Sequence, residues 1–248
     1  MGSGLSNSTC ASQQVIELYS DLALNPHKDF GWAKGIENAR SHGYKQEWIE
    51  QLPASLWDYC AAVGNPFTIG KFPVDSTVLD LGCGAGVDVC VASLLVGEGG
   101  KVIGVDITPL MVQTAQRHAN DAGLNNVEVV EASLESLPFE DESIDIIISN
   151  GAINLTSSKE KVFAEAFRVL RRGGKLYFAD MIKRSDIQVS ACCSQDSWAD
   201  CVAGTLEEAC LLAQITGAGF SDAQCMGHTH YTTSASTIGA TFCAVKKG

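Results

Sequence analysis

Glycines and carboxylates follow one another in one short stretch of the chain, at spacings that could hold a small nucleotide-like cofactor. Gly82, Gly84 and Gly86 come directly after an apolar run, V-L-D-L, that contains Asp80. A second apolar run, K-V-I-G-V-D, ends at Asp106. Glycine permits a sharp turn and a close approach of the backbone to a ligand. A carboxylate about 20 residues further on, at the end of the next strand, is placed to accept hydrogen bonds from ribose hydroxyls.

The glycine spacing favours one class of cofactor over another. Dinucleotide-binding turns read G-x-G-x-x-G and offer a helix N-terminus to a pyrophosphate. This turn reads G-x-G-x-G, has no Lys or Arg near it, and lies among three acids, Asp80, Asp88 and Asp106. Such a site suits a ligand with a cationic centre and free ribose hydroxyls. S-adenosylmethionine (SAM) is a ligand of that kind, and the pattern therefore predicts SAM as the cofactor.

Apolar runs and helical patterns alternate through the rest of the chain, and these elements must position the glycine turn. The run S-I-D-I-I-I-S is nearly continuous in its apolar residues, as strands buried in a parallel sheet are. Thr108 followed by Pro109 is typical of a helix start. The pattern predicts an α/β fold, a doubly wound, seven-stranded and mostly parallel sheet with an N-terminal helical cap. The predicted strands are 78–81, 101–106, 127–130, 143–149, 175–181, 222–226 and 237–245, with helices at 89–96, 109–122, 159–170 and 206–217.

The chain divides into three predicted segments. Residues 1–12 are rich in Gly, Ser and Asn, and we expect a disordered tail. We expect residues 13–72 to form the helical cap. Residues 73–248 are predicted to form the SAM-binding α/β domain, with elements of the substrate site in about 186–248.

Two helical patterns make up the predicted cap, at 13–24 and 46–63, and Pro53 is expected to kink or break the second. The tail before them also matches the N-myristoylation pattern M-G-x-x-x-S through Gly2, with Cys10 as a candidate for a second acylation site. A plain disordered tail or an added N-terminal scar is the favoured interpretation, and acylation is the alternative.

Composition excludes several classes of partner. The chain has 248 residues, a net charge of −12 and a sequence pI near 4.7. Nucleic acids and anionic membrane surfaces attract basic patches, so neither is an expected partner. No apolar run approaches the roughly 20 residues of a membrane span, and no secretory segment is recognised. We therefore predict a cytoplasmic protein with a small-molecule substrate; the sequence sets no oligomeric state.

Ten cysteines are many for a chain of this length. In a reducing compartment they are expected to remain thiols and not to form a disulfide framework. No C-x-x-C pair is present, and we predict no metal site. His228 and His230 are interpreted as surface residues near the end of a strand.

Several stretches together resemble the class I SAM-dependent methyltransferases. The matching segments are V-L-D-L-G-C-G-A-G (78–86), G-V-D-I-T (104–108), L-E-S-L-P-F (134–139) and E-A-F-R-V-L-R-R-G-G-K-L (165–176). The resemblance implies a SAM-dependent transferase with the fold predicted above. It places the glycines beneath the methionine part of SAM, Asp106 on the ribose, and Ser133 and Leu134 along the adenine. The predicted cofactor-binding residues are Asp80, Gly82, Cys83, Gly84, Gly86, Asp106, Ile107, Thr108, Met111, Ser133, Leu134 and Asn150.

Within that class the chain resembles the arsenite methyltransferases. The segments that carry this resemblance are 88–108, I-S-N-G-A-I-N-L (148–155), W-A-D-C-V-A-G-T-L (198–206) and A-G-F (218–220). That family binds trivalent arsenic through several cysteine thiolates, which are soft ligands for a soft centre. Cys201 matches the C-terminal cysteine, and together with Asn150 it is the predicted catalytic pair.

Two of the family's arsenic-binding cysteines are absent. Gly151 stands in the place of one, and Asn65 lies near the place of the other. Cys60, Cys192 and Cys193 are candidates to substitute for them. The predicted function is methyl transfer to arsenite or a related soft nucleophile, for which the sequence offers no obvious general base and needs none. The alternatives are S-methylation of sulfide or small thiols, C-methylation of an organic metabolite, and a non-catalytic protein that binds SAM or a metalloid.

Overall fold

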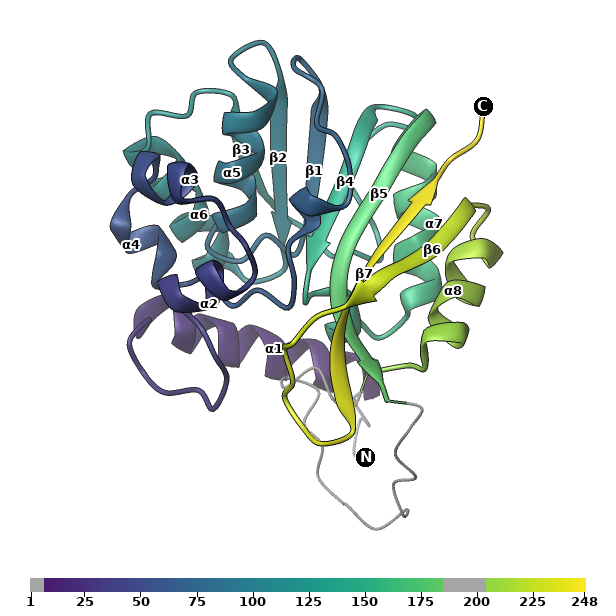
Figure 1. The fold of residues 1–248 in the computed structure, drawn as a ribbon, viewed down its shortest axis with the longest axis horizontal. Helices are drawn as coiled ribbons and strands as arrows, with labels where there is room; N and C mark the ends of the chain where they lie inside the picture. The colour runs from purple at the N-terminus through teal and green to yellow at the C-terminus, as the bar shows by residue number, and fades with distance from the viewer. Residues whose placement is uncertain (1–6, 185–203) are drawn as a thin grey trace, which may run out of the picture.

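The structure is a computed structural model that describes residues 7–184 and 204–248 (Figure 1). Seven strands form one sheet in the order β3-β2-β1-β4-β5-β7-β6. The strands are β1 (Thr77–Leu81), β2 (Lys101–Asp106), β3 (Val127–Glu131), β4 (Ile144–Asn150), β5 (Leu170–Lys183), β6 (Ser221–His228) and β7 (Thr237–Val245). Strands β1 to β5 are parallel, whereas β7 runs antiparallel to both β5 and β6. The predicted fold class is confirmed.

Helices cover both faces of the sheet and one of its ends. The helices are α1 (Asn7–Leu24), α2 (Ile36–Ser41), α3 (Gln46–Gln51), α4 (Ala54–Trp57), α5 (Val87–Val96), α6 (Pro109–Asp121), α7 (Lys159–Val169) and α8 (Glu208–Gly217), with 3₁₀ turns η1 (Pro66–Thr68) and η2 (Ile153–Leu155). Helix α1 crosses the end of the sheet at which the parallel strands finish (Figure 1). No helix in the described part of the chain is long and apolar enough to cross a membrane.

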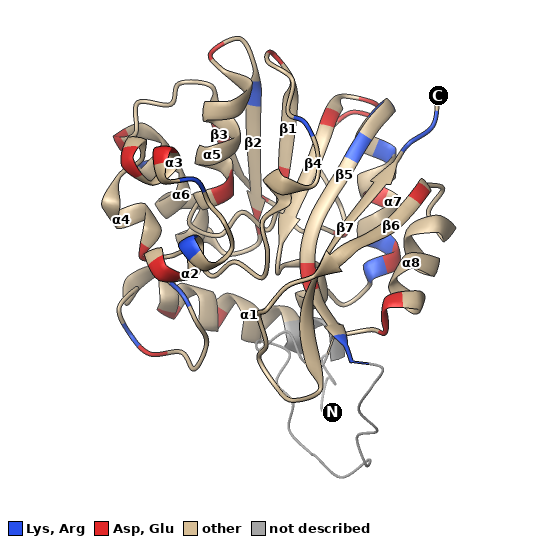
Figure 2. Ribbon diagram, viewed as in Figure 1, with Lys and Arg blue, Asp and Glu red and all other residues tan. Residues whose placement is uncertain are grey.

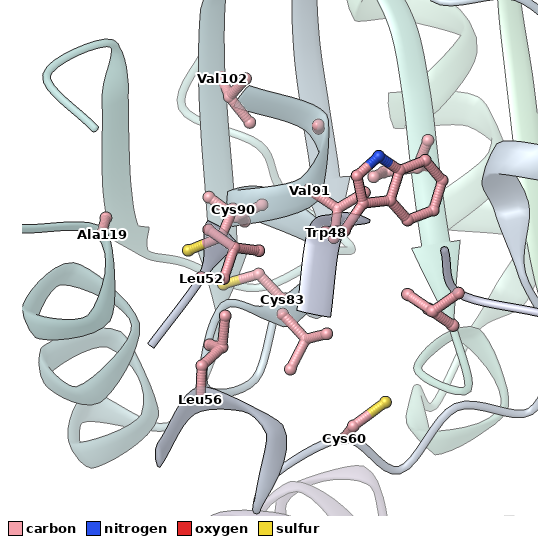
Figure 3. Packing of buried hydrophobic residues seen from close by; sticks show 14 of the residues in the cluster. Trp48, Leu52, Leu56, Cys60, Cys83, Cys90, Val91, Val102 and Ala119 are labelled. Carbon is pink, nitrogen blue, oxygen red and sulfur yellow. The ribbon is translucent and has the colours of Figure 1, made fainter. Parts of the chain in front are cut away.

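The sheet separates two hydrophobic cores, because successive side chains of a strand point to opposite faces. Val78 of β1 packs in the core formed by the cap, α5 and α6. Its neighbour Leu79 packs in the other core, with α7 and α8. Figure 3 shows Trp48, Leu52 and Leu56 of the cap gathered in one cluster with Cys90 and Val91 of α5. The cap is thus packed onto the same face of the sheet as the helix that follows the glycine turn.

Several predicted boundaries differ from the structure. Helix α1 begins at Asn7, so the second half of the stretch expected to be a disordered tail is helical. No Gly or Pro lies between Leu5 and Asn25 to stop the helix from extending upstream. The pattern at 46–63 breaks at Pro53 as expected but ends at Trp57. Strand β5 begins at Leu170, before the start of the predicted strand at 175, so Gly173 and Gly174 lie within it.

The division into a cap and a SAM-binding domain remains a prediction. Part of the proposed substrate-site region, including Cys192, Cys193 and Cys201, lies outside the described residues. Figure 2 shows Lys and Arg scattered among Asp and Glu over the described ribbon.

Candidate active site

A cavity of about 460 Å³ opens where the parallel strands end. The order of strands reverses between β1 and β4, and open α/β sheets bind ligands outside such a point. The glycine turn, the end of β2 and the segment after β4 line the cavity, together with α1 and aromatic residues of the cap. Its volume lies in the range of cofactor and small-molecule sites.

The glycine turn has a backbone that other residues cannot easily adopt. Gly82 has φ +75°, and a Cβ there would lie 2.1 Å from the Cβ of Ala152. Gly84, with φ +51°, has nothing within 4 Å of such a Cβ, and it lines the cavity. Gly86 has φ +91° and is the N-cap residue of α5, packed against Ala115. Gly86 does not line the cavity, and it is the only predicted cofactor residue that the structure places outside it.

Asp106 ends β2 with its carboxylate already holding the turn. Oδ2 accepts a hydrogen bond of 2.9 Å from the Gly84 N–H, and Oδ1 accepts one of 2.8 Å from the Thr108 N–H. Burial raises the pKa of Asp106, while these two N–H donors oppose the rise. A carboxylate has about four acceptor positions. Acceptor positions therefore remain on Asp106 for the ribose hydroxyls that the sequence analysis predicts it to bind.

Asp80 is a buried acid without a complete set of partners. It is 2 % exposed, and its Oδ2 has no hydrogen-bond partner within the described residues. Burial, together with the charges of Asp88 and Asp106, raises its pKa well above the ordinary value. No Lys, Arg or His lines the cavity in the part of the chain that the structure describes. Four acids, Asp80, Asp88, Asp106 and Glu135, line the cavity. Acids without a protein cation among the described lining residues fit a ligand with positively charged groups, and SAM carries an ammonium and a sulfonium.

Asn150 lies at the end of β4 and connects three segments through its amide. Its Nδ2 donates to Asp88 Oδ2 at 3.1 Å and lies 3.1 Å from the Tyr44 hydroxyl. Its Oδ1 accepts from the Val63 N–H at 2.9 Å. The amide is occupied by protein groups, so the structure gives Asn150 the position of a residue that holds others in place around the cavity.

Tyr44 and Asp88 form a buried pair beside Asn150. The Tyr44 hydroxyl donates to Asp88 Oδ1 at 2.6 Å. Burial raises the pKa of Asp88 to about 6, although the bonds from Tyr44 and Asn150 oppose the rise. The sequence indicates Asp88 only as one of the nearby acids and does not point to Tyr44, because no motif joins two residues so far apart in the chain. The only local feature of the sequence that relates to this pair is the position of Asp88 in the first turn of α5, directly after the glycine turn.

The remaining predicted cofactor residues come together on the β2 side of the cavity. Met111 is buried and packs with Leu22 of α1 and Ala85 of the turn. The Ser133 hydroxyl accepts from the Glu135 N–H at 3.2 Å and so shapes its own loop. Burial raises the pKa of the Cys83 thiol well above its ordinary value. The residues of this group that line the cavity are Cys83, Ile107, Thr108, Met111, Ser133 and Leu134.

The positions of the arsenite-family cysteines can be followed in the structure. The Oδ1 of Asn65 accepts from the Phe67 N–H at 3.0 Å and caps η1, and Asn65 does not line the cavity. Val63, two residues before Asn65, does line the cavity. It lies close to Gly151, where an added Cβ would be 3.1 Å from Val63 Cγ2. No three cysteines of the described chain come together as a thiolate cage requires.

Cys60 is the candidate substitute thiol that the structure describes. It lines the cavity, is 2 % exposed, and its Sγ donates to Asn38 Oδ1 at 3.6 Å. Burial raises the pKa of this thiol well above its ordinary range. The other candidates, Cys192 and Cys193, and the predicted catalytic Cys201 lie outside the described residues.

One group of residues that line the cavity is uncharged. Tyr231, Thr233 and Ser234, from the connection between β6 and β7, form this uncharged wall together with Leu155 and Met181. The Thr229 hydroxyl donates to the Val63 carbonyl at 2.8 Å and ties this connection to the cap. Nothing in the sequence predicts this wall, because a run of Thr and Ser between two strands carries no motif.

Comparisons with known proteins give the family of this arrangement. A family model described as a methyltransferase domain matches residues 74–232. The chain is 38 % identical over 157 residues to an arsenite methyltransferase of Halobacterium salinarum, which is 63 % of this chain and 40 % of that protein. It is 43 % identical over 109 residues to a ubiquinone/menaquinone biosynthesis C-methyltransferase of Salmonella arizonae, or 43 % of each protein. The chain thus matches about two fifths of the length of these curated relatives.

Among solved structures, the chain is similar to an arsenic(III) S-adenosylmethionine methyltransferase from Chlamydomonas reinhardtii. The TM-score is 0.69 at 29 % sequence identity, over 82 % of this chain and 73 % of that one. The resemblance to class I SAM-dependent methyltransferases, and to the arsenite methyltransferases among them, is confirmed.

Proposed function

The chain belongs to the methyltransferase-domain family of SAM-dependent enzymes, and we propose that it methylates arsenite or a related soft, uncharged small molecule. The observation that carries the proposal is the cavity itself. Its described lining includes four acids and no Lys, Arg or His, together with the hydroxyl and apolar groups of Tyr231, Thr233, Ser234, Leu155 and Met181. The similarity to arsenite methyltransferases covers 63 % of the chain, which is more than the 43 % that the C-methyltransferase match covers.

The chain's own residues have three tasks in this reaction. Asp106 binds the ribose hydroxyls, and Asp80 meets the ammonium group of the cofactor. Asn150 fixes the backbone at Val63 and thereby one wall of the acceptor site. SAM supplies, when bound, a methyl group on a sulfonium that needs no further activation. The protein accordingly acts by alignment of a nucleophile and exclusion of water, which can contribute several kcal/mol to a reaction of this kind.

Arsenic would be held with fewer protein thiolates than in the relatives. Val63 and Gly151 face one another without a thiol. We therefore propose that arsenic arrives already bound to small cellular thiols, and that Cys201 supplies a protein thiolate. A thiolate is the preferred ligand of a soft centre, and a lone pair on As(III) needs no base to become a nucleophile.

A second candidate function is C-methylation of an organic acceptor. The buried Tyr44–Asp88 pair favours it, because a carboxylate whose pKa is raised to about 6 can accept a proton from a carbon or hydroxyl acid near neutral pH. A soft acceptor such as arsenite has no use for such a base. The match to a C-methyltransferase agrees with this candidate.

One assay separates the two candidates. The purified chain is incubated with methyl-labelled SAM and, in separate reactions, arsenite with glutathione, sulfide, a small thiol and a panel of hydroquinones, and labelled products are identified by mass spectrometry. The proposal expects labelled methylarsenic species that depend on glutathione. Labelled organic product with no methylarsenic at any glutathione concentration would overturn it in favour of C-methylation.

A further inference from the structure

A mixed set of metal-binding side chains lies outside the cavity, between the start of α8 and the end of β6. Glu208, Cys225 and His228 each present a ligand atom, and these atoms all lie within 4.8 Å of one another. His228 Nε2 and Glu208 Oε2 lie 3.0 Å apart. Figure 1 shows α8 beside β6 at the edge of the sheet, and Figure 2 shows acidic residues at the start of α8.

The local backbone of β6 brings Cys225 and His228 to the same side. In a regular strand, residues three apart point to opposite faces. Here the pairing with β7 shifts register, since Cys225 pairs with Phe242 while Gly227 pairs with Thr241. Two steps along β6 are thus opposed by one step along β7, as in a β-bulge, and such bulges redirect side chains. Both side chains consequently reach the carboxylate of Glu208.

The chemistry of the three donors identifies the class of ion. A thiolate, an imidazole and a carboxylate together are the ligand types of Zn²⁺, whereas Ca²⁺ and Mg²⁺ select oxygen donors alone. Three protein ligands leave one position of a tetrahedral ion for water. We propose that Glu208, Cys225 and His228 form a binding site for Zn²⁺, or another borderline divalent cation, that is separate from the methyl-transfer cavity.

The position of the site in the fold indicates which elements a bound ion would connect. It would join the first turn of α8 to the end of β6. The chain continues from His228 directly to Thr229, whose hydroxyl is bonded to the cap, and then to Tyr231 in the cavity wall. An ion at this site would stabilise the strand end from which the uncharged wall begins.

The test is a calorimetric titration of the metal-free full chain with Zn²⁺. We expect Cys225→Ser and His228→Gln each to weaken binding by at least about tenfold, since loss of even an outer partner of a ligand commonly costs 10–100-fold. Cys210→Ser is the matched control, because Cys210 is an exposed cysteine of α8 outside the cluster. His230→Gln is the control for histidine. Both controls should bind Zn²⁺ as the wild type does.

A second measurement uses Co²⁺ in place of Zn²⁺. The wild type and Cys210→Ser should show a thiolate-to-cobalt charge-transfer band, and Cys225→Ser should lack it. Should Cys225→Ser fail to fold, His228→Gln still decides the matter, because His228 is exposed. Zn²⁺ should also raise the melting temperature of the wild type and not that of His228→Gln. Absence of Zn²⁺ uptake by the wild type, or equal affinity in the wild type and His228→Gln, would refute the site.

Discussion

The phenol of Tyr44 donates a 2.6 Å hydrogen bond to Oδ1 of Asp88 and joins the cap to the helix that follows the glycine turn. Both groups are buried, and the Asn150 amide completes the cluster from the end of β4. A buried carboxylate is tolerated when donors surround it, yet its charged form remains costly relative to water. This cluster therefore makes the stability of the chain depend on pH.

Replacement of Asp88 by Asn should remove that dependence. Burial raises the pKa of Asp88 from 3.8 to about 6, so below about pH 4 the group contributes its full stabilisation, which is lost as the pH rises through about 6. A shift of one pKa unit corresponds to about 1.4 kcal/mol. As the pH rises from about 4 to above 6, the unfolding free energy of the wild type should therefore fall by on the order of 3 kcal/mol relative to that of Asp88→Asn. Urea unfolding at a series of pH values measures the difference. Glu98→Gln, an exposed acid, is the control for charge, and a constant difference between wild type and Asp88→Asn contradicts the prediction.

Replacement of Asp106 by Ala should weaken SAM binding by about 100-fold or more. The carboxylate is expected to provide two charge-assisted hydrogen bonds to the ribose, each worth about 1.5 kcal/mol or more. Because Asp106 also accepts from Gly84 and Thr108, Asp106→Asn serves as a milder variant that keeps one acceptor oxygen. Calorimetry with SAM measures the affinity, and circular dichroism checks the fold. Equal affinity of the folded Ala variant and the wild type would remove Asp106 from the ribose site.

The glycine turn allows a prediction that compares two neighbouring residues. Gly82→Ala places a Cβ 2.1 Å from that of Ala152 at φ +75°, so both steric overlap and backbone strain oppose it. Gly84→Ala meets nothing within 4 Å and carries strain alone, about 1 kcal/mol. Thermal unfolding should show Gly82→Ala to be less stable than Gly84→Ala by about a further 1–3 kcal/mol, the usual cost of overpacking. Equal melting temperatures for the two variants would contradict the close approach of Ala152 to the turn.

The sequence predicted those features that a local pattern determines. Val78 and Leu79 alternate between two cores because an apolar run flanked by turns describes a strand buried on both faces. The position of Asp106 followed from one strand and one turn. The contacts between Tyr44 and Asp88, or between Val63 and Gly151, arise only when the cap folds onto the sheet. No periodicity records such a contact, and the hydroxyl wall at Thr233 was missed for the same reason.

The proposed acceptor leads to a prediction about Cys201. If As(III) is the substrate, Cys201→Ser should abolish arsenite methylation, because a hydroxyl is a poor ligand for a soft centre. SAM affinity should be unchanged, and Cys210→Ser, in which another thiol is lost from an exposed position, should retain activity. Single-turnover assays with arsenite and glutathione measure the loss.

The same assay can also test the effect of adding a thiol at Val63, which faces Gly151. Val63→Cys places a thiol in the cavity next to Gly151, without the strain that a Cys at Gly151, with φ +73°, would add. An additional soft ligand should lower the glutathione concentration needed for half-maximal arsenite methylation. Val63→Ser is the matched control, with a similar volume and a hard oxygen. Two results together would show that arsenic is not held by thiolates in this cavity. In the first, Val63→Cys binds SAM but requires as much glutathione as Val63→Ser. In the second, Cys201→Ser is as active as the wild type.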